Sequence, residues 1–362
     1  MKNERKILLF AVIIISLFGA LMIYSSSYVW AEYKFNDPFK YLKSQLIFLF
    51  IGYLAMHLIS KFPYKKYKQL ANIIFGICTA MLALVLIPGI GTVRNGSRSW
   101  FGIGGFGIQP SEFTKLGLII FTSKYLSNNE RDLKSIKKGV LPILGILFLV
   151  FGLIMLEPDF GTGIVIVITI VVLLFISGVK MNFFIKIGIL GLIGIIGLII
   201  IAPYRMKRIV SFLNPWSDPL GSGFQIIQSL YAIGPGGLLG LGLGNSIQKH
   251  FYLPEPQTDF IFSIISEELG FMGVIIVSTL FLIIIISGFK ISMKCTDKFG
   301  KYLSFGITFG LSFQALLNLM VVTGLIPVTG VTLPFLSYGG SSLIISLISI
   351  GILLNIAKYN EI

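Results

Sequence analysis

The chain has 362 residues, of which 55% are hydrophobic and 12% are charged. Because a soluble domain carries about 25% charged residues, this composition excludes an ordinary soluble protein and predicts a membrane protein with several spans. The formal net charge of +14 does not indicate nucleic-acid binding, since the basic residues lie in short segments between apolar stretches, where they set the topology and face anionic membrane lipids.

Ten apolar stretches follow one another along the chain, and each is close to the length of about 20 residues that a helix needs to cross a bilayer. They lie at about residues 7–29, 44–60, 70–88, 111–127, 139–156, 162–179, 185–202, 261–288, 302–324 and 336–357. The predicted fold class is therefore an all-α polytopic membrane protein with ten transmembrane helices. We expect residues 1–362 to form a single membrane domain.

The basic residues fall unevenly on the two sides that ten spans define. With Lys2, Arg5 and Lys6 placed in the cytoplasm, nineteen of the 29 basic residues are cytoplasmic and nine are outside, with Lys115 inside a span. This excess follows the positive-inside rule and places both termini in the cytoplasm. It also places one large extracellular loop, at about residues 203–259, between the seventh and eighth spans.

This large outer loop is longer than most connections without a function, and its many apolar residues argue against disorder. Its stretch FQIIQSLYAI places Gln228 on the polar side of a short amphipathic helix in the membrane interface. The next stretch, GPGGLLGLGLGN, is rich in glycine. These glycines either let the backbone approach a bulky ligand or allow tight packing against other spans, and the sequence favours neither.

Asp259 ends the outer loop. It follows Pro254 and Pro256 and precedes the apolar run of the eighth span, so we expect it at the outer, N-terminal end of that helix. The helix dipole favours a carboxylate there. Asp259 is therefore either the cap of this helix or a functional carboxylate, and the charged neighbours Lys249 and Glu255 favour a functional site.

Four more charged residues are predicted inside spans. Glu267 and Glu268 lie about 12 Å along the helix axis from Asp259, and we expect them to hold the bundle together by pairing with basic groups rather than to take part in chemistry. Glu112 and Lys115 are three residues apart in the fourth span. They share a face of the helix and are predicted to form an internal ion pair beside a cavity.

Two carboxylates flank a proline at the outer end of the fifth span. Glu157 and Asp159 either solvate the end of this helix or bind a divalent cation. The outer cations best suited to a phosphate-bearing ligand are Arg94, Arg98 and Lys249. Carboxylates and cations outside an apolar bundle fit either an enzyme that acts on an anionic lipid-linked substrate or a transporter of such a substrate.

Four stretches of the chain resemble the SEDS family of FtsW, RodA and SpoVE proteins. They are GSRSWFGIGGFGIQPSEFTKL, EPDFGTG, GSGFQIIQSLYAIGPGGLLGLGLGNSIQKHFYLPEPQTDFIFSIISEELGF and PVTGVTLPFLSYGGSS. They occur in the order that the family shows, and the run GLGNSIQKHFYLPEPQTDFIF is nearer to FtsW and SpoVE than to RodA. One departure, SRSW, stands where relatives often have a small residue before Arg-Arg-Trp or Arg-Trp. It leaves open whether Arg94 or Arg98 does the family's work.

The resemblance implies a peptidoglycan glycosyltransferase that polymerises lipid II at the outer face of the bacterial cytoplasmic membrane, in division, cell shape or sporulation. The family's essential aspartate falls on Asp259, which implies a general base that takes a proton from the 4-hydroxyl of the acceptor sugar. The anomeric carbon of the donor is then inverted and undecaprenyl pyrophosphate leaves. The family's glutamate–lysine pair falls on Glu112 and Lys115, and we assign that pair a structural role.

The same resemblance implies ligands and partners. The residues predicted to contact substrate are Arg94, Arg98, Lys249, Glu255, Gln228 and Ser337. A divalent cation, Mg²⁺ or Mn²⁺, is a candidate cofactor, with Glu157 and Asp159 as its candidate ligands. The expected partners are lipid II, the nascent glycan strand, membrane lipids and a class B penicillin-binding protein, a transpeptidase whose single helix docks on the bundle.

Two other functions compete with the glycosyltransferase. A lipid II flippase needs polar residues through the middle of the membrane, and the polar content within the spans is low. A non-catalytic scaffold for envelope proteins leaves the cluster of outer carboxylates unexplained. The low polar content of the spans and the outer carboxylates therefore favour the enzyme over the flippase and the scaffold.

Overall fold

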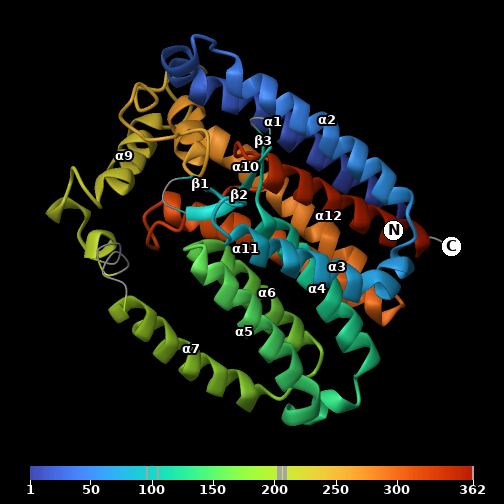
Figure 1. The fold of residues 1–362 in the computed structure, drawn as a ribbon. Coiled ribbons are helices and arrows are strands. Elements are labelled where there is room, and N and C mark those ends of the chain that lie inside the picture. Colours follow the sequence, from blue (N-terminus) through green and yellow to red (C-terminus); the bar gives the residue numbers. More distant parts are fainter. Residues whose placement is uncertain (95–96, 104–105, 202–205, 207–209, 361–362) are drawn as a thin grey trace.

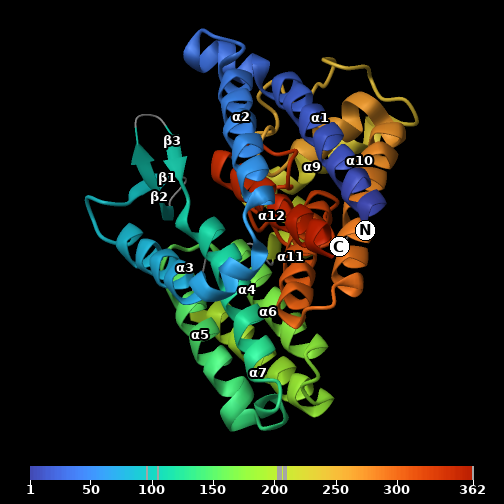
Figure 2. The same ribbon diagram turned by 90° about the vertical axis from the view of Figure 1, so that its right-hand side faces the viewer.

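The computed structural model describes the chain except for residues 95–96, 104–105, 202–205, 207–209 and 361–362. Long helices run side by side and form a bundle, with a small sheet at one end (Figure 1). The two ends of the chain lie next to each other at the opposite end in both views (Figures 1 and 2). There Lys294 pairs with Glu4 at 2.7 Å.

The elements have the following bounds. The helices are α1 Lys2–Phe35, α2 Lys40–Lys61, α3 Tyr64–Val85, α4 Pro110–Asn128, α5 Leu141–Leu156, α6 Phe160–Ile176, α7 Met181–Ile201, α9 Phe224–Ile233, α10 Ile261–Lys294, α11 Lys298–Val322 and α12 Gly340–Tyr359. Short helical turns are η1 Asp132–Lys134, η2 Ile136–Val140, η3 Pro215–Ser217 and η4 Gly234–Gly236. The strands are β1 Thr92–Arg94, β2 Ser97–Ile103 and β3 Phe106–Ile108.

Seven of the described helices are long and apolar enough to cross a membrane, namely α1, α2, α3, the continuous helix Ile136–Leu156 that contains α5, α10, α11 and α12. Two shorter apolar helices are Phe160–Ile176 and Met181–Gly194. The predicted class, a mostly helical membrane protein with several spans, is therefore confirmed. The count of ten spans remains a prediction.

The helix α12 forms the centre of the bundle. In its most apolar window, 89% of the residues are buried, against 22% in α3. It packs most extensively against α2 and also touches α1, α4, α10 and α11. Small residues allow this close approach, because a Cβ atom on Gly351 would lie only 2.8 Å from the carbonyl oxygen of Met56.

A three-stranded antiparallel sheet forms in the connection between α3 and α4. The strand order is β1-β2-β3, with Thr92 opposite Trp100 and Phe101 opposite Ile108. The sheet packs through β2 against α3 and α4 and through β3 against α12. It therefore covers the same end of the bundle as the start of α4.

The long helix α10 is broken at Gly270, whose backbone has φ 59° and ψ −154°. The break exposes backbone groups of α10 to the glycine-rich stretch that follows α9. Leu241 N and Gly242 N donate hydrogen bonds to the carbonyl oxygens of Glu267 and Glu268, each at 2.9 Å. A Cβ atom on Gly240 would lie 2.1 Å from the Glu268 carbonyl oxygen. The sequence left open whether these glycines allow the approach of a ligand or tight packing against a span, and the structure shows tight packing against α10.

The helix α7 lies at the edge of the bundle. It stands apart from the other long helices in Figure 1, and its main packing partner is α6. Large apolar side chains such as Leu190 and Ile200 remain exposed, as expected for a helix that faces lipid.

Candidate active site

Asp259 lies directly before α10, and its side chain is half-buried. The N-cap residue of α10 is Phe260, and no side chain caps this helix. The Asp259 Oδ1 atom instead accepts a hydrogen bond from the hydroxyl of Thr258 at 3.0 Å. The capping reading of Asp259 therefore does not apply in this structure. The carboxylate is partly open to solvent.

The backbone of Asp259 is fixed by a buried amide side chain. Asn318 Nδ2, on α11, donates to the carbonyl oxygen of Asp259 and to that of Val331, both at 2.7 Å. Nearby, Tyr338 N donates to the carbonyl oxygen of Gln257 at 2.8 Å. The segment that carries Asp259 is thus joined to the segment 331–338. Asn318 is fully buried, so this junction is shielded from water.

A second buried polar group continues from this junction into the bundle. Lys115 Nζ, on α4, lies 2.8 Å from Glu112 Oε2 and also donates to Gln314 Oε1. Gln314 Nε2 in turn donates to the carbonyl oxygen of Thr332 at 3.0 Å. Gln314 is four residues before Asn318 and therefore shares its face of α11. One face of α11 thus joins the Glu112–Lys115 pair to the segment that holds Asp259.

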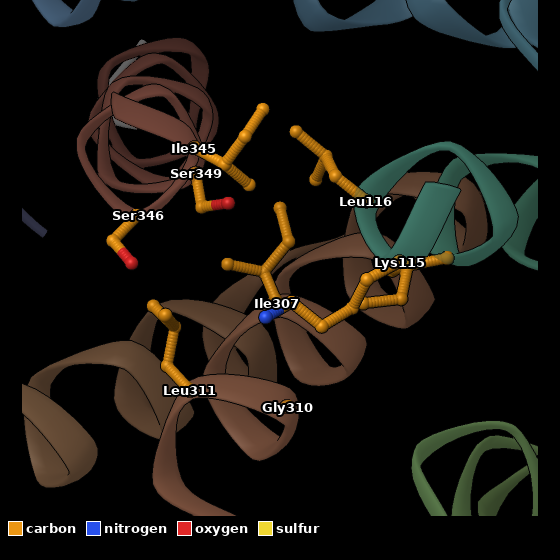
Figure 3. A pocket seen from close by; sticks show the side chains of 9 residues that line it. Lys115, Leu116, Ile307, Gly310, Leu311, Ile345, Ser346 and Ser349 are labelled. Carbon is orange, nitrogen blue, oxygen red and sulfur yellow. The ribbon is translucent and has the colours of Figure 1, made fainter. Parts of the chain in front are cut away.

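The pair also lies beside a hollow. Figure 3 shows the Lys115 side chain extending from α4 toward α11 along a small hollow, whose other walls come from α11 and α12. Most of the walls of the hollow are apolar, with Leu116, Ile307 and Leu311, and α12 adds the hydroxyls of Ser346 and Ser349. Among the described residues, Lys115 is therefore the only charged one in the lining of this hollow.

The cation Lys249 is not at the surface where the sequence analysis placed it. Its side chain is fully buried, and its Nζ atom lies 2.7 Å from Glu268 Oε1 and 4.8 Å from the ring centroid of Tyr28. Ser25 of α1 donates to the other oxygen of Glu268. The predicted contact between Lys249 and a substrate does not fit this environment, because the ammonium group is already paired and shielded.

Glu267 binds the backbone that precedes Lys249. Its carboxylate accepts hydrogen bonds from the backbone N–H groups of Ile247 at 2.8 Å and Gln248 at 3.3 Å, and from the Ser246 hydroxyl. Glu267 and Glu268 therefore hold the outer segment onto α10 and α1. Their structural role was expected. The basic partner, Lys249, comes from the outer segment, and the span α1 contributes the hydroxyl of Ser25.

Both carboxylate oxygens of Asp159 accept hydrogen bonds, one at the start of α6 and one from residues at the start of α4. Its Oδ1 atom accepts from Thr162 N at 3.1 Å, which caps α6. Its Oδ2 atom accepts from Gln109 Nε2 at 3.1 Å and from the Ser111 hydroxyl at 3.4 Å. Burial raises its pKa above the ordinary value.

Glu157 is fully buried, and neither of its carboxylate oxygens has a hydrogen-bond partner among the described residues. Burial, and then the nearby Asp159, raise the pKa of Glu157 to about 8. Glu157 is therefore mainly protonated at neutral pH.

These two carboxyl groups do not fit a divalent-cation site. The oxygens of Asp159 already accept three hydrogen bonds, and a cation would have to displace some of them. Within the described residues, no group of three or more His, Cys, Asp and Glu side chains gathers in a way that could hold a metal ion. The part of the chain that the structure describes thus shows no assembled ligand set, and the requirement for Mg²⁺ or Mn²⁺ stays a prediction.

The other predicted contacts are spread over several elements. Arg98 is half-buried in β2, and Glu255 is exposed just before Asp259. Gln228 is half-buried on α9, the amphipathic helix that the sequence predicts. Ser337 is buried and accepts a hydrogen bond from Leu333 N at 2.8 Å, so its hydroxyl shapes the segment 331–338. Arg94 ends β1, and its side chain lies outside the described part.

Sequence reasoning missed the residues that join these groups. Asn318 and Gln314 fix the segments around Asp259, and Ser25 links Glu268 to α1. A signal was present, because two amide side chains four residues apart on one face of an otherwise apolar helix need buried partners.

The fold and these buried polar groups define a helical integral membrane protein with a carboxylate site at one end of its bundle. The family model described as "Cell cycle protein", for FtsW, RodA and SpoVE, matches residues 5–362. The chain belongs to this family, and the resemblance predicted from the four stretches is confirmed.

Individual relatives agree with the family match. Stage V sporulation protein E of Bacillus subtilis is 52% identical over 343 residues, which cover 95% of this chain and 94% of the relative. A probable peptidoglycan glycosyltransferase FtsW of Geobacter sp. (strain M18) is 41% identical over 351 residues, with 97% and 96% covered.

Two solved structures have the same fold. One comes from work on the coordination of polymerization and crosslinking by a peptidoglycan synthase complex, with a TM-score of 0.79, 31% identity, and 98% and 97% of the two chains covered. The other is the rod shape determining protein RodA of Thermus thermophilus, with a TM-score of 0.72, 29% identity, and 97% and 95% covered.

Proposed function

We propose that this protein is a peptidoglycan glycosyltransferase that joins lipid II units into glycan strands. The observation that carries the proposal is Asp259, a half-buried carboxylate that does not cap α10 and whose backbone is fixed by the buried Asn318. The relatives named as glycosyltransferases and the peptidoglycan synthase complex with the same fold support it.

In the proposed reaction, Asp259 accepts the proton of the 4-hydroxyl of the acceptor sugar. The oxygen attacks the anomeric carbon of the donor as the bond from that carbon to the pyrophosphate oxygen breaks. The new glycosidic bond has inverted configuration, and undecaprenyl pyrophosphate leaves with the bonding electron pair. Fixing the backbone of Asp259 keeps its carboxylate in position, because an error of about 1 Å in such a group can lower a rate by about 100-fold.

The charge of the leaving pyrophosphate needs cations close by. We assign this task to Arg98 and Arg94 in the sheet, and Glu255 and Gln228 to contacts with the sugar or peptide part. Lys249 and Ser337 are assigned to the support of the site, because both side chains are buried and bonded within the protein. A requirement for Mg²⁺ or Mn²⁺ remains a prediction that a polymerisation assay with and without chelator tests.

The proposed topology has ten spans in the bacterial cytoplasmic membrane. Adding α4, α6 and α7 to the seven long apolar helices gives ten, and the segment between α7 and α10 is then the large extracellular loop. Both termini lie together at the end away from the sheet (Figure 1), which supports their common, cytoplasmic location. We expect the single helix of a class B penicillin-binding protein to dock on the exposed apolar faces of the bundle.

The flippase alternative needs a polar route from one membrane surface to the other. The buried polar groups described here run from Asp259 to Lys115, and the hollow beside Lys115 is lined mainly by apolar residues, with the two hydroxyls of Ser346 and Ser349 and, among the described residues, no further charge. This arrangement supports chemistry at one end of the bundle rather than transport through it.

The test uses the purified chain with its partner transpeptidase and lipid II. Glycan polymer is expected from the wild type and not from Asp259→Asn, which keeps the shape of the side chain but cannot take the proton. Glu32→Gln, at an exposed carboxylate near the end of α1, serves as the matched control and should retain polymer. Full polymerisation by a correctly folded Asp259→Asn variant would refute the general-base role. Lipid II transport across vesicles without polymer would favour the flippase.

A further inference from the structure

A hollow opens at the end of the bundle away from Asp259. It lies where the connection between α4 and α5 meets the turn between α6 and α7, and it has about 540 Å³ of empty space, including the part open to solvent. The helix α5 leads from this hollow to Glu157, beside the sheet, so the hollow and the candidate active site lie at opposite ends.

The hollow has an apolar floor and a polar rim. Leu133, Val179 and Phe183 line the floor and are each no more than 6% exposed. Ser135 and Lys137 belong to one side of the rim, and Lys180 belongs to the other. These three rim residues are exposed.

The two rim lysines lack compensating charge. Among the side chains that the structure describes, no carboxylate pairs with Lys137 or Lys180. Glu130 pairs with Lys298 instead, and Asp132 is not part of the lining. Two cations on the rim of an apolar floor attract an anion that carries an apolar part.

We propose that this hollow binds the head group of an anionic phospholipid. The phosphate lies between the Lys137 and Lys180 ammonium groups and accepts from the Ser135 hydroxyl, while the glycerol and the first acyl carbons lie on the floor. A lipid is favoured over a free phosphate because the floor is apolar. The large side chains of Ile136 and Met181 beside the rim are also exposed by 49% and 60%, as expected where acyl chains cover them.

The lipid would connect two parts of the chain that touch little otherwise. The helix α7 starts at Met181, directly after Lys180, and packs chiefly against α6. A phosphate held by lysines from both connections would tie the start of α7 to the connection between α4 and α5. The bound lipid thus serves as part of the bundle.

The test compares Lys137→Ala/Lys180→Ala with Lys65→Ala/Lys358→Ala, a control that removes the same charge from exposed positions at the same end of the bundle. The full chain is placed in nanodiscs of phosphatidylcholine with increasing phosphatidylglycerol, and retained lipid is counted by native mass spectrometry after release into detergent. The wild type and the control are expected to retain phosphatidylglycerol. The hollow variant, Lys137→Ala/Lys180→Ala, is expected to retain at least about tenfold less, because it loses both charged hydrogen-bond donors that the proposal places on the phosphate.

Two results would overturn the proposal. Equal retention of phosphatidylglycerol by the hollow variant and by the control would show that the lysines act only as general surface charge. Equal protection of the wild type by inorganic phosphate and by phosphatidylglycerol, measured as the shift in melting temperature, would assign the hollow to a soluble anion. Circular dichroism of each variant confirms that the helices remain folded.

Discussion

Replacing Lys249 by methionine removes one partner of a fully buried ion pair. Methionine has a similar length and no charge, so it fills much of the same space. The carboxylate of Glu268 would keep its hydrogen bonds from Ser25 and from Ser246 N but lose the ammonium group of Lys249, which lies 2.7 Å away. The contact of the ammonium group with the Tyr28 ring would also be lost.

The expected loss of stability is large. Breaking a buried pair by removing one partner costs about 3–5 kcal/mol, because an uncompensated charge remains. The loss should be local at first, since Lys249 belongs to the outer segment and Glu268 to α10. The segment before Asp259 would detach more easily, and polymerisation would fall with it.

A double-mutant cycle with Glu268→Gln separates support from substrate binding. If Lys249 supports the fold, Glu268→Gln in the Lys249→Met background removes the unpaired charge and restores part of both stability and activity. If Lys249 bound the substrate, Glu268→Gln would restore neither. Lys290→Met, at an exposed position of α10, is the matched control.

The assays are thermal unfolding in detergent, limited proteolysis of the segment 234–259, and glycan polymerisation. The reasoning fails if Lys249→Met unfolds at the same temperature as Lys290→Met while its polymerisation is lost. That outcome would indicate that Lys249 contacts the substrate rather than supports the fold.

Three further outcomes are expected. Asn318→Leu should lower polymerisation by roughly 100-fold, because Asp259 would be misplaced. Asn318→Gln should recover part of that loss. An unchanged rate in the leucine variant would argue against the positioning role. The pKa of Glu157 in the folded protein is raised to about 8. The unfolded chain therefore releases this proton first, and stability falls as pH rises from about 4.5 to about 8. Glu157→Gln should raise the melting temperature more at pH 8 than at pH 5, and equal shifts at the two pH values would contradict this. Gly240→Ala should destabilise the protein, because its Cβ atom would meet the Glu268 carbonyl oxygen and its φ is +77°, whereas Gly145→Ala, with nothing within 4 Å, should have no such effect in thermal unfolding.

Local patterns predicted the parts of this protein that depend on nearby residues. Long apolar runs predicted the long helices, and the spacing of Gln228 among apolar residues predicted α9. Glu112 and Lys115 are three residues apart, and the structure places their charged atoms 2.8 Å apart. In each case one helix fixes the geometry, so the sequence is sufficient.

Contacts between distant segments could not be read in the same way. Lys249 is buried because the outer segment folds back onto the break at Gly270, where it meets Glu268 and a serine of α1. Ser337 looked available for a ligand but closes a buried turn. Each outcome depends on which backbone groups a remote segment leaves unpaired, and a residue's neighbours in the chain do not reveal this.

The central place of α12 affects how the protein assembles. This helix is synthesised after α1–α11, and yet it packs against α1, α2, α4, α10 and α11. Helices inserted earlier must remain loosely arranged around an incomplete centre until residues 340–359 enter the membrane. The bundle should therefore become resistant to protease late and in one cooperative step, rather than helix by helix during synthesis.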